Sequence, residues 1–225
     1  MRLGLSMRVN ETLEQNELRD SISHDWYRLL QAWNHVPVLI PNGLKNVELY
    51  LSALSLNGLI LTGGNDLSPH LSGIPENKTS TLAPLRDQTE HYLLNYAVEN
   101  KIPVLGVCRG LQTINCYFGG TLSPVKSETH VAKVHAISVH GDSWGAIFGY
   151  SMKVNSYHRY GIASDSLAKT LIPFAFDQEG FVEAAAHNDL PVLGIMWHPE
   201  RIQPEPLANE ALLSRLLTEG VFWKL

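Results

Sequence analysis

Residues 104–112, with the sequence VLGVCRGLQ, determine the fold of this 225-residue chain more than any other stretch. An apolar run typical of a buried strand ends in Gly-x-Cys-x-Gly, and an amphipathic helix follows at once. A nucleophile on such a sharp turn needs small neighbours, because the backbone there is crowded and strained. The N-terminus of the helix favours the thiolate of Cys108 through its free N–H groups and its dipole. The segment therefore predicts an α/β fold with an activated cysteine.

Strand-like and helix-like segments alternate on the N-terminal side of this turn. The strand-like segments are apolar throughout instead of alternating with polar residues, which is typical of a parallel sheet covered by helices on both faces. We expect strands at residues 3–9, 37–41, 59–61 and 102–107, and helices at residues 16–34, 47–56 and 86–100.

The second half of the chain has short connections between strand-like segments. The turn sequence at residues 177–180, DQEG, predicts an antiparallel hairpin. We find no linker or repeat, so residues 1–225 are expected to form a single domain. The loop at residues 68–84 is either a lid over the site or an ordinary surface loop. Further strands are expected at residues 136–139, 152–154, 171–176, 181–186 and 192–197, and a closing helix at residues 207–217.

The composition excludes several classes of protein. The formal net charge is -5 and no run of Lys or Arg occurs, which argues against binding to nucleic acid or to an anionic membrane surface. No apolar run is long enough to span a bilayer, and the N-terminal segment is too short and interrupted for a signal peptide. The two cysteines, Cys108 and Cys116, form no disulfide pattern, so a cytoplasmic location is expected.

A base and an orienting group for the thiolate occur together near the C-terminus. In residues 194–200, GIMWHPE, an apolar strand leads to His198, and Glu200 follows two residues later. Glu200 is placed to bind the imidazole and to fix its tautomer. A lone histidine after a strand is usually structural, but two segments with complementary roles predict a Cys108–His198–Glu200 triad.

A tetrahedral intermediate also needs an oxyanion hole. Gly63 and Gly64 follow a strand and present backbone N–H groups without side chains in the way. The N–H of Arg109, directly after the nucleophile, is the expected second donor beside Gly64. A tight turn is the plainer explanation of the two glycines taken alone.

These motifs resemble those of a known superfamily. GVCRGLQ at residues 106–112, TGGNDLSP at residues 62–69 and WHPE at residues 197–200 resemble the class I glutamine amidotransferases. NSYH at residues 155–158 is similar to a segment of the γ-glutamyl-γ-aminobutyrate hydrolase branch, the peptidase C26-like group. The resemblance implies a flavodoxin-like three-layer α/β/α sandwich, with a mostly parallel central sheet and an added antiparallel hairpin. It also implies a triad that works without metal or organic cofactor.

The resemblance further implies a reaction. Cys108 would attack a γ-glutamyl carbonyl, and His198 would protonate the leaving amine. Water would then release glutamate from the thioester. On spacing alone, Gln112 is a helix-surface residue or a buried hydrogen-bonding partner, and His158 is either a packed histidine or a site residue. In relatives, positions that match the following residues bind the glutamyl group: Gly63, Gln112, Ser156, Tyr157 and His158.

The chain departs from the family pattern on the leaving-group side. Arg159 and Tyr160 stand where relatives often have His-Gln, and Met196 replaces a glutamine. Arg159 is either a surface residue or a contact for an anionic leaving group such as a carboxylate or phosphate. His130, His135 and His140 recur every five residues, a spacing that alternates faces on a strand and argues against a metal site.

Three functions stay open from the sequence. The first is a hydrolase of a γ-glutamyl amino acid, γ-glutamyl amine or γ-glutamyl nucleotide amidate, which needs only its substrate and water. The second is a glutaminase subunit that delivers ammonia to a partner synthase. The third is a non-enzymatic binding or regulatory protein, which the intact triad disfavours. The oligomeric state, monomer or homodimer, is also open.

Overall fold

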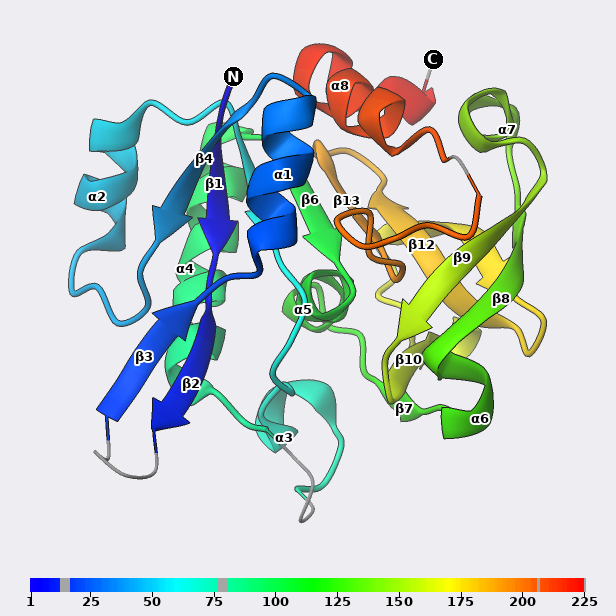
Figure 1. Cartoon of the computed structure of the whole chain (residues 1–225), viewed down its shortest axis with the longest axis horizontal. Coiled ribbons are helices and arrows are strands. Elements are labelled where there is room, and N and C mark those ends of the chain that lie inside the picture. Colours follow the sequence, from blue (N-terminus) through cyan, green and yellow to red (C-terminus); the bar gives the residue numbers. More distant parts are fainter. Residues whose placement is uncertain (13–16, 77–80, 206, 225) are drawn as a thin grey trace.

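A parallel sheet forms the centre of the molecule, seen in a computed structural model that describes residues 1–12, 17–76, 81–205 and 207–224. Its strands are apolar because both faces are covered by helices, as Figure 1 shows. In spatial order, the parallel strands are β4 (Val36–Ile40), β1 (Arg2–Ser6), β5 (Gly58–Leu61), β6 (Val104–Val107) and β13 (Val192–Ile195).

The core has two parts, one on each face of this sheet. Successive side chains of a strand point to opposite faces. Accordingly, Ile60 packs in one apolar cluster, whereas Leu59 and Leu61 pack in the other. Together with the helices on both faces, this arrangement confirms the expected three-layer α/β/α sandwich.

Six main helices supply the outer layers. Their apolar residues divide between the two clusters as the sandwich requires. The first cluster includes residues of α1 (His24–Ala32), α7 (Asp142–Phe148), α8 (Asn209–Glu219) and the 3₁₀ turn η2 (Phe222–Lys224). The second includes residues of α2 (Val47–Leu54), α4 (Pro84–Asn100) and α5 (Arg109–Tyr117). Shorter helical turns are α3 (Pro69–Ser72), α6 (Ser127–His130) and η1 (Ser164–Ser166).

The sheet continues beyond β13 with antiparallel strands. The hairpin predicted around residues 177–180 is confirmed by the pairing of β11 with β12. The antiparallel part is larger than that hairpin alone, since β8 and β9 extend it further. These strands are β12 (Phe181–His187), β11 (Leu171–Asp177), β8 (Val131–Val139) and β9 (Ser151–Tyr157). In addition, β10 (Tyr160–Ala163) pairs with β12, and β7 (Ser123–Pro124) pairs with β10.

The prediction for the N-terminal segment was wrong in two respects. The strand expected at residues 3–9 breaks at Met7, and β2 (Arg8–Thr12) pairs with β3 (Glu17–Ser21) in a separate hairpin. The helix expected over residues 16–34 begins only at His24, and its first position, Asn16, lies outside the described residues. Tertiary contacts override the helical spacing here, because the carboxylate of Asp20 on β3 accepts hydrogen bonds from Asn42 N (2.8 Å) and Nδ2 (2.7 Å).

The loop at residues 68–84 is anchored at its base. The N–H of Thr81 donates to Oδ2 of Asp66 (2.8 Å), and the N–H of Asp66 donates to the carbonyl of Thr81 (3.0 Å). Its residues 77–80 lie outside the described part of the chain. A lid function for this loop stays a prediction.

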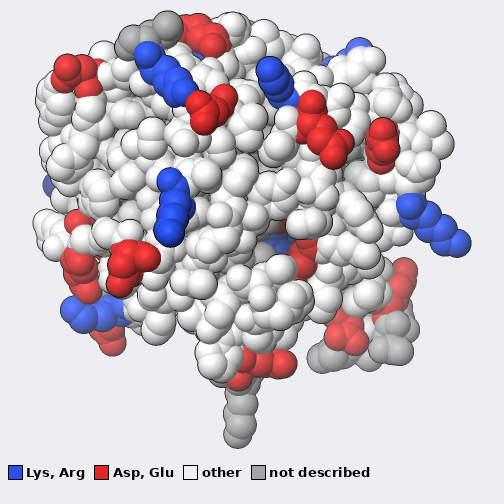
Figure 2. All heavy atoms as spheres, turned by 180° about the vertical axis from the view of Figure 1, so that it is seen from behind, with Lys and Arg blue, Asp and Glu red and all other residues white. Residues whose placement is uncertain are grey.

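No described helix has the length and apolarity needed to cross a membrane. Figure 2 shows the face behind the view of Figure 1, where described basic and acidic side chains are scattered. The described side chains on that face form no continuous basic patch of the kind that follows a nucleic-acid backbone.

Close packing of α5 on the sheet yields a test of the fold. A Cβ atom added at Gly110 would lie 2.1 Å from the carbonyl oxygen of Leu61. Alanine inside a helix is normally favoured over glycine by about 1 kcal/mol. We nevertheless expect Gly110→Ala to lower the free energy of unfolding by at least about 3 kcal/mol, because a central strand has no room to move. Urea-induced unfolding followed by circular dichroism measures the change.

Gly119→Ala is the control for this variant. Gly119 has a φ of 92° but no atom within 4 Å of an added Cβ. Only the backbone strain remains, which costs about 1–2 kcal/mol. A loss for Gly110→Ala no larger than that of Gly119→Ala would contradict the close approach of α5 to β5.

Candidate active site

A pocket of about 280 Å³ lies at the carboxyl edge of the parallel strands. Parallel strands end at the same edge, so residues that follow different strands converge there. Cys108 follows β6, Gly64 follows β5 and His198 follows β13, and all three line the pocket. The other lining residues are Arg8, Asn65, Asp66, Thr81, Arg109, Gln112, Val131, Tyr157, His158, Arg159, Tyr160 and Arg201.

Cys108 occupies a strained turn between β6 and α5. Its φ is 54° and its ψ is -105°, a conformation that costs free energy for a residue with a Cβ atom. The N–H of Cys108 donates to the carbonyl of Ile195 on the neighbouring strand (2.8 Å), which helps to hold the turn. The thiol therefore sits at the N-terminal end of α5, as the sequence predicted.

His198 and Glu200 form a hydrogen-bonded pair beside this turn. Nδ1 of His198 lies 2.7 Å from Oε1 of Glu200, and both side chains are buried. The opposite ring nitrogen, Nε2, makes no hydrogen bond with any described residue. The predicted orienting contact between Glu200 and His198 is thus present, and Nε2 is available to the thiol.

The electrostatics of the site favour a charged pair. Burial raises the pKa of the Cys108 thiol, but the interaction with His198, together with the charge of His158, outweighs burial and lowers this pKa from 9.0. Burial lowers the pKa of His198, whereas Cys108 and Glu200 raise it to about 9. The same interaction shifts the two pKa values in opposite directions, which favours thiolate with imidazolium.

The glycine loop after β5 is held by a buried arginine. Arg86 on α4 donates to the carbonyl oxygens of Thr62 (2.6 Å), Gly63 (3.2 Å) and Gly64 (2.8 Å). In a trans peptide the N–H points away from the preceding carbonyl. The N–H of Gly64 is therefore directed away from Arg86, and Gly64 itself lines the pocket.

The side chain of Arg109 points into the protein and not toward a substrate. Its guanidinium pairs with Asp87 (2.5 Å) and with Glu90, and Glu90 also pairs with Arg86 (2.8 Å). Burial raises the pKa of Glu90, but Arg109 and Arg86 outweigh it and lower this pKa to about 2. This network joins the glycine loop to the helix that begins after Cys108.

Asn155 positions His198 through the main chain, which the sequence analysis missed. The N–H of His198 donates to Oδ1 of Asn155 (2.8 Å), and Nδ2 of Asn155 donates to the carbonyl of His198 (3.0 Å). Asn155 stands in the NSYH segment, but no sequence spacing links it to a strand more than forty residues away.

The residues predicted to bind the glutamyl group divide into two sets. Gln112, Tyr157 and His158 line the pocket. Gly63 instead lies against the imidazole, since a Cβ there would be 2.6 Å from Cε1 of His198. Ser156 points away and donates to the carbonyl of His130 (2.8 Å).

Three arginines give the pocket a basic character. Arg159 is exposed and lines the pocket, and its contact with a leaving group stays a prediction. The sequence analysis missed Arg8, on β2, and Arg201, which lies 4.0 Å above the ring of Tyr157. Burial and the charge of Arg201 lower the pKa of Arg8, so these two cations share one environment. Two sequence positions could have identified these arginines. Arg8 comes shortly after the strand β1, and Arg201 directly follows Glu200.

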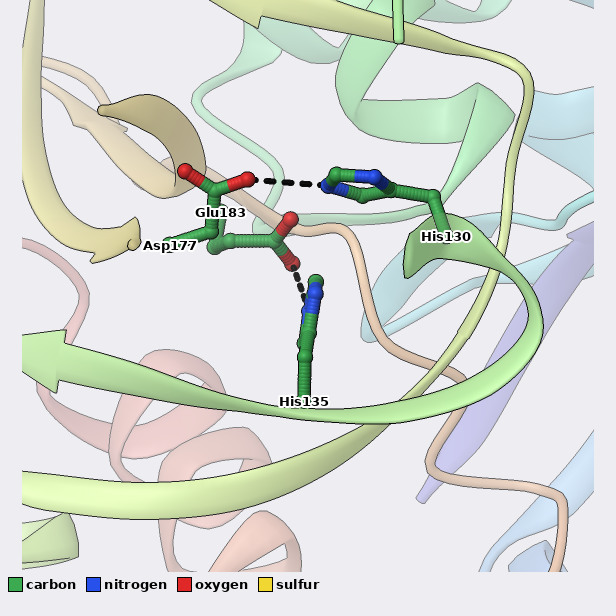
Figure 3. Close-up of side chains that lie close together, drawn as sticks. All are labelled: His130, His135, Asp177 and Glu183. Atoms are coloured by element: carbon green, nitrogen blue, oxygen red, sulfur yellow. Dashed lines mark hydrogen bonds and ion pairs between the residues drawn. The ribbon is translucent and has the colours of Figure 1, made fainter. Parts of the chain in front are cut away.

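The interpretation that His130 and His135 point to opposite faces of one strand was wrong. His130 ends α6 and does not lie on β8, and the pairing of β8 is irregular between Val131 and Lys133. The rings of His130 and His135 therefore come within 5.0 Å of each other, and Figure 3 shows both directed toward Asp177 and Glu183. His140, in contrast, follows the end of β8 and is exposed.

Comparisons with known proteins identify the family of this chain. The family model for peptidase C26 matches residues 3–200. The γ-glutamyl-CDP-amidate hydrolase of Campylobacter jejuni is 29% identical, with 89% of this chain and 90% of the relative covered. The γ-glutamyl-γ-aminobutyrate hydrolase PuuD of Escherichia coli K12 is 30% identical, with 82% and 78% covered.

Solved structures confirm the fold. A glutamine amidotransferase from Thermotoga maritima superposes with a TM-score of 0.61, at 13% identity and with 88% of this chain and 76% of that chain covered. This likeness supports the flavodoxin-like arrangement that the sequence motifs implied.

The charged pair predicts selective alkylation of Cys108. We expect iodoacetamide to modify Cys108 readily at about pH 7, because the thiolate persists below the ordinary pKa of cysteine. His198→Asn should slow this reaction at least about tenfold, since the cation that lowers the thiol pKa is lost. Mass spectrometry of the alkylated protein over time gives the rate.

Cys116 is an internal control in the same experiment. Burial raises the pKa of its thiol to about 12, so Cys108→Ala should leave the protein almost unmodified. Equal rates for the wild type and His198→Asn would contradict activation of the thiol by His198.

Proposed function

Because this chain belongs to the peptidase C26 family, we propose that it is a cysteine hydrolase that cleaves the γ-glutamyl amide bond of a small compound. One observation supports this proposal above the others. Cys108 on its strained turn shares a pocket with His198, and His198 is oriented by Glu200 at 2.7 Å. The γ-glutamyl hydrolases of C. jejuni and E. coli are relatives of this chain.

The proposed first step forms a thioester. The thiolate of Cys108 attacks the γ-carbonyl carbon, and the carbonyl oxygen becomes an oxyanion. The backbone N–H groups of Gly64 and Arg109 are the proposed donors to it. When the tetrahedral intermediate collapses, the C–N bond breaks and Nε2 of His198 gives its proton to the leaving amine.

The second step regenerates the enzyme. Water attacks the thioester, and Nε2 of His198 accepts one of its protons. The C–S bond then breaks, so glutamate leaves and the thiolate is restored. Glu200 keeps the imidazole in the tautomer that both steps need, since its carboxylate accepts from Nδ1.

The leaving group is proposed to be anionic. Arg159, Arg201 and Arg8 line the pocket, and we place the amine portion of the substrate beside these three cations. The only acidic side chain in the described lining is Asp66, which is engaged by Thr81. A carboxylate or phosphate on the amine portion fits this charge, and the C. jejuni relative is named for a nucleotide amidate.

Glutamate release from a substrate panel tests the reaction. The panel comprises glutamine, γ-glutamyl-γ-aminobutyrate, a neutral γ-glutamyl anilide and a γ-glutamyl phosphoramidate. We expect turnover without any partner protein, faster for an anionic amide than for glutamine. Cys108→Ala should lower kcat by a factor of about 10⁴ or more, because no nucleophile remains.

Cys116→Ala is the matched control and should keep the activity of the wild type, because Cys116 lies outside the pocket lining. Glutaminase activity that appears only with an added synthase would instead favour the glutaminase subunit. Full activity of Cys108→Ala would overturn the proposed nucleophile.

The arginines of the pocket give a test of the leaving group. Arg159→Ala should raise KM for an anionic amide about tenfold, because one charged contact is lost, and should leave KM for the neutral anilide unchanged. Steady-state kinetics on both substrates measure the difference. Arg28→Ala, an exposed arginine on α1, is the control and should change neither value. Equal effects on both substrates would remove Arg159 from the leaving-group contact.

A further inference from the structure

A second group of titratable side chains lies among α6, β8 and the β11–β12 hairpin, and the proposed hydrolysis does not use it. Nε2 of His130 is 2.8 Å from Oδ2 of Asp177, and Nε2 of His135 is 3.6 Å from Oε2 of Glu183. One ligand atom from each of the four residues lies within 4.8 Å of the others. Figure 3 shows the four side chains pointing toward one another.

Glu183 is buried without the hydrogen bonds that a carboxylate needs. It is 1% exposed, and neither carboxylate oxygen has a hydrogen-bond partner within the described residues. The ring nitrogens that face it are Nε2 of His135 and, at 3.5 Å, Nε2 of His158, and neither of these makes a hydrogen bond. A buried charge in this state needs a compensating positive charge.

His158 borders the cluster on the side of the pocket. Nδ1 of His158 is 3.1 Å from the carbonyl oxygen of Tyr160, and its Nε2 lies 3.5 Å from Oε1 of Glu183 without a hydrogen bond. A cation bound by Glu183 would supply the positive charge that this buried carboxylate needs.

We propose that His130, His135, Asp177 and Glu183 bind a divalent transition-metal ion, with zinc as the ion that their donor atoms fit best. Two imidazole nitrogens and two carboxylate oxygens supply the four ligands of a tetrahedral site. The two carboxylates balance the charge of the ion. Calcium and magnesium are disfavoured because they require mainly oxygen ligands.

The surroundings of the cluster suit such a site. Bonds to zinc would place the four ligand atoms about 3.4 Å apart. The more widely spaced atoms would approach from at most 4.8 Å, and Nε2 of His130 and Oδ2 of Asp177 would move apart from 2.8 Å. Nδ1 of His130 lies 3.2 Å from the carbonyl of Lys126, the usual second contact of a metal-binding histidine. Oδ1 of Asp177 accepts from the N–H groups of Glu179 (2.9 Å) and Phe181 (2.8 Å), which leaves Oδ2 for the metal.

The ion would join the corner between α6 and β8 to the β11–β12 hairpin. These are the antiparallel strands that accompany β9, whose end carries Tyr157 and His158 into the pocket. His158 would lie beside the ion on one side and beside the hydrolytic pocket on the other. The metal thus stabilises the wall of the pocket and takes no part in bond cleavage.

Cobalt(II) absorption tests the site without using a substrate. The full chain carrying Cys108→Ala, which removes the catalytic thiolate as a competing ligand, is treated with a chelator and titrated with Co²⁺. We expect one equivalent to bind, with visible absorption bands of a tetrahedral complex that added Zn²⁺ abolishes. Zinc should also raise the Tm of this protein.

Variants in the same background connect the signal to the cluster. Glu183→Gln and His135→Ala should each weaken Co²⁺ binding about 100-fold or more and abolish the rise in Tm with zinc. His140→Ala, an exposed histidine just after β8, is the matched control and should bind as the parent does. Absence of cobalt bands and of any Tm shift in the parent would overturn the proposal and leave protonated histidines as the counter-charge. Unchanged binding by both Glu183→Gln and His135→Ala would overturn it as well.

Discussion

The buried ion pairs between Arg86, Glu90, Arg109 and Asp87 are the constraint on which the site depends. Charges this deep are costly unless every one is paired, and breaking one such pair typically costs about 3–5 kcal/mol. The network accordingly fixes its members in one arrangement. Arg86 holds three consecutive carbonyls of the glycine loop, and Arg109 is the first residue of the helix behind Cys108. The two halves of the proposed oxyanion hole are thus tied to the same carboxylate, Glu90.

Close packing provides the second constraint. The turn at Cys108 requires α5 to lie almost directly on the strands, and Gly110 allows this because its hydrogen atom faces the carbonyl of Leu61. Gly63 likewise leaves room for the imidazole of His198, since a side chain at this position would overlap with the ring. The glycines around the site are therefore needed for the space they leave as much as for their backbone N–H groups.

The antiparallel part of the sheet contributes a residue that holds His198 in place. The parallel strands lead to Cys108, the glycine loop and His198. Strand β9 contributes Asn155, which holds the main chain of His198 by two hydrogen bonds, and it ends at the pocket wall. Arg8 enters from the small β2–β3 hairpin. The residues of the proposed hydrolysis thus follow strands of the central sheet. The positive charge proposed to contact the leaving group comes from elements outside these strands.

Local patterns were sufficient for the parts of the protein that are local in sequence. The alternation of apolar strands with helices predicted a parallel sheet covered on both faces. The turn at Cys108 and the close pair His198 and Glu200 predicted two parts of the candidate site, because strand ends in a parallel sheet meet at one edge. The tertiary structure alone decided which distant polar groups meet. In the structure, Ser156 donates a hydrogen bond to the carbonyl of His130, away from the pocket. Arg8 and Arg201 line the same pocket. His130 and His135 lie close to Glu183. Periodicity failed at those points because a hairpin, a helix end and a strand irregularity changed the direction of the side chains, and sequence spacing does not encode such changes.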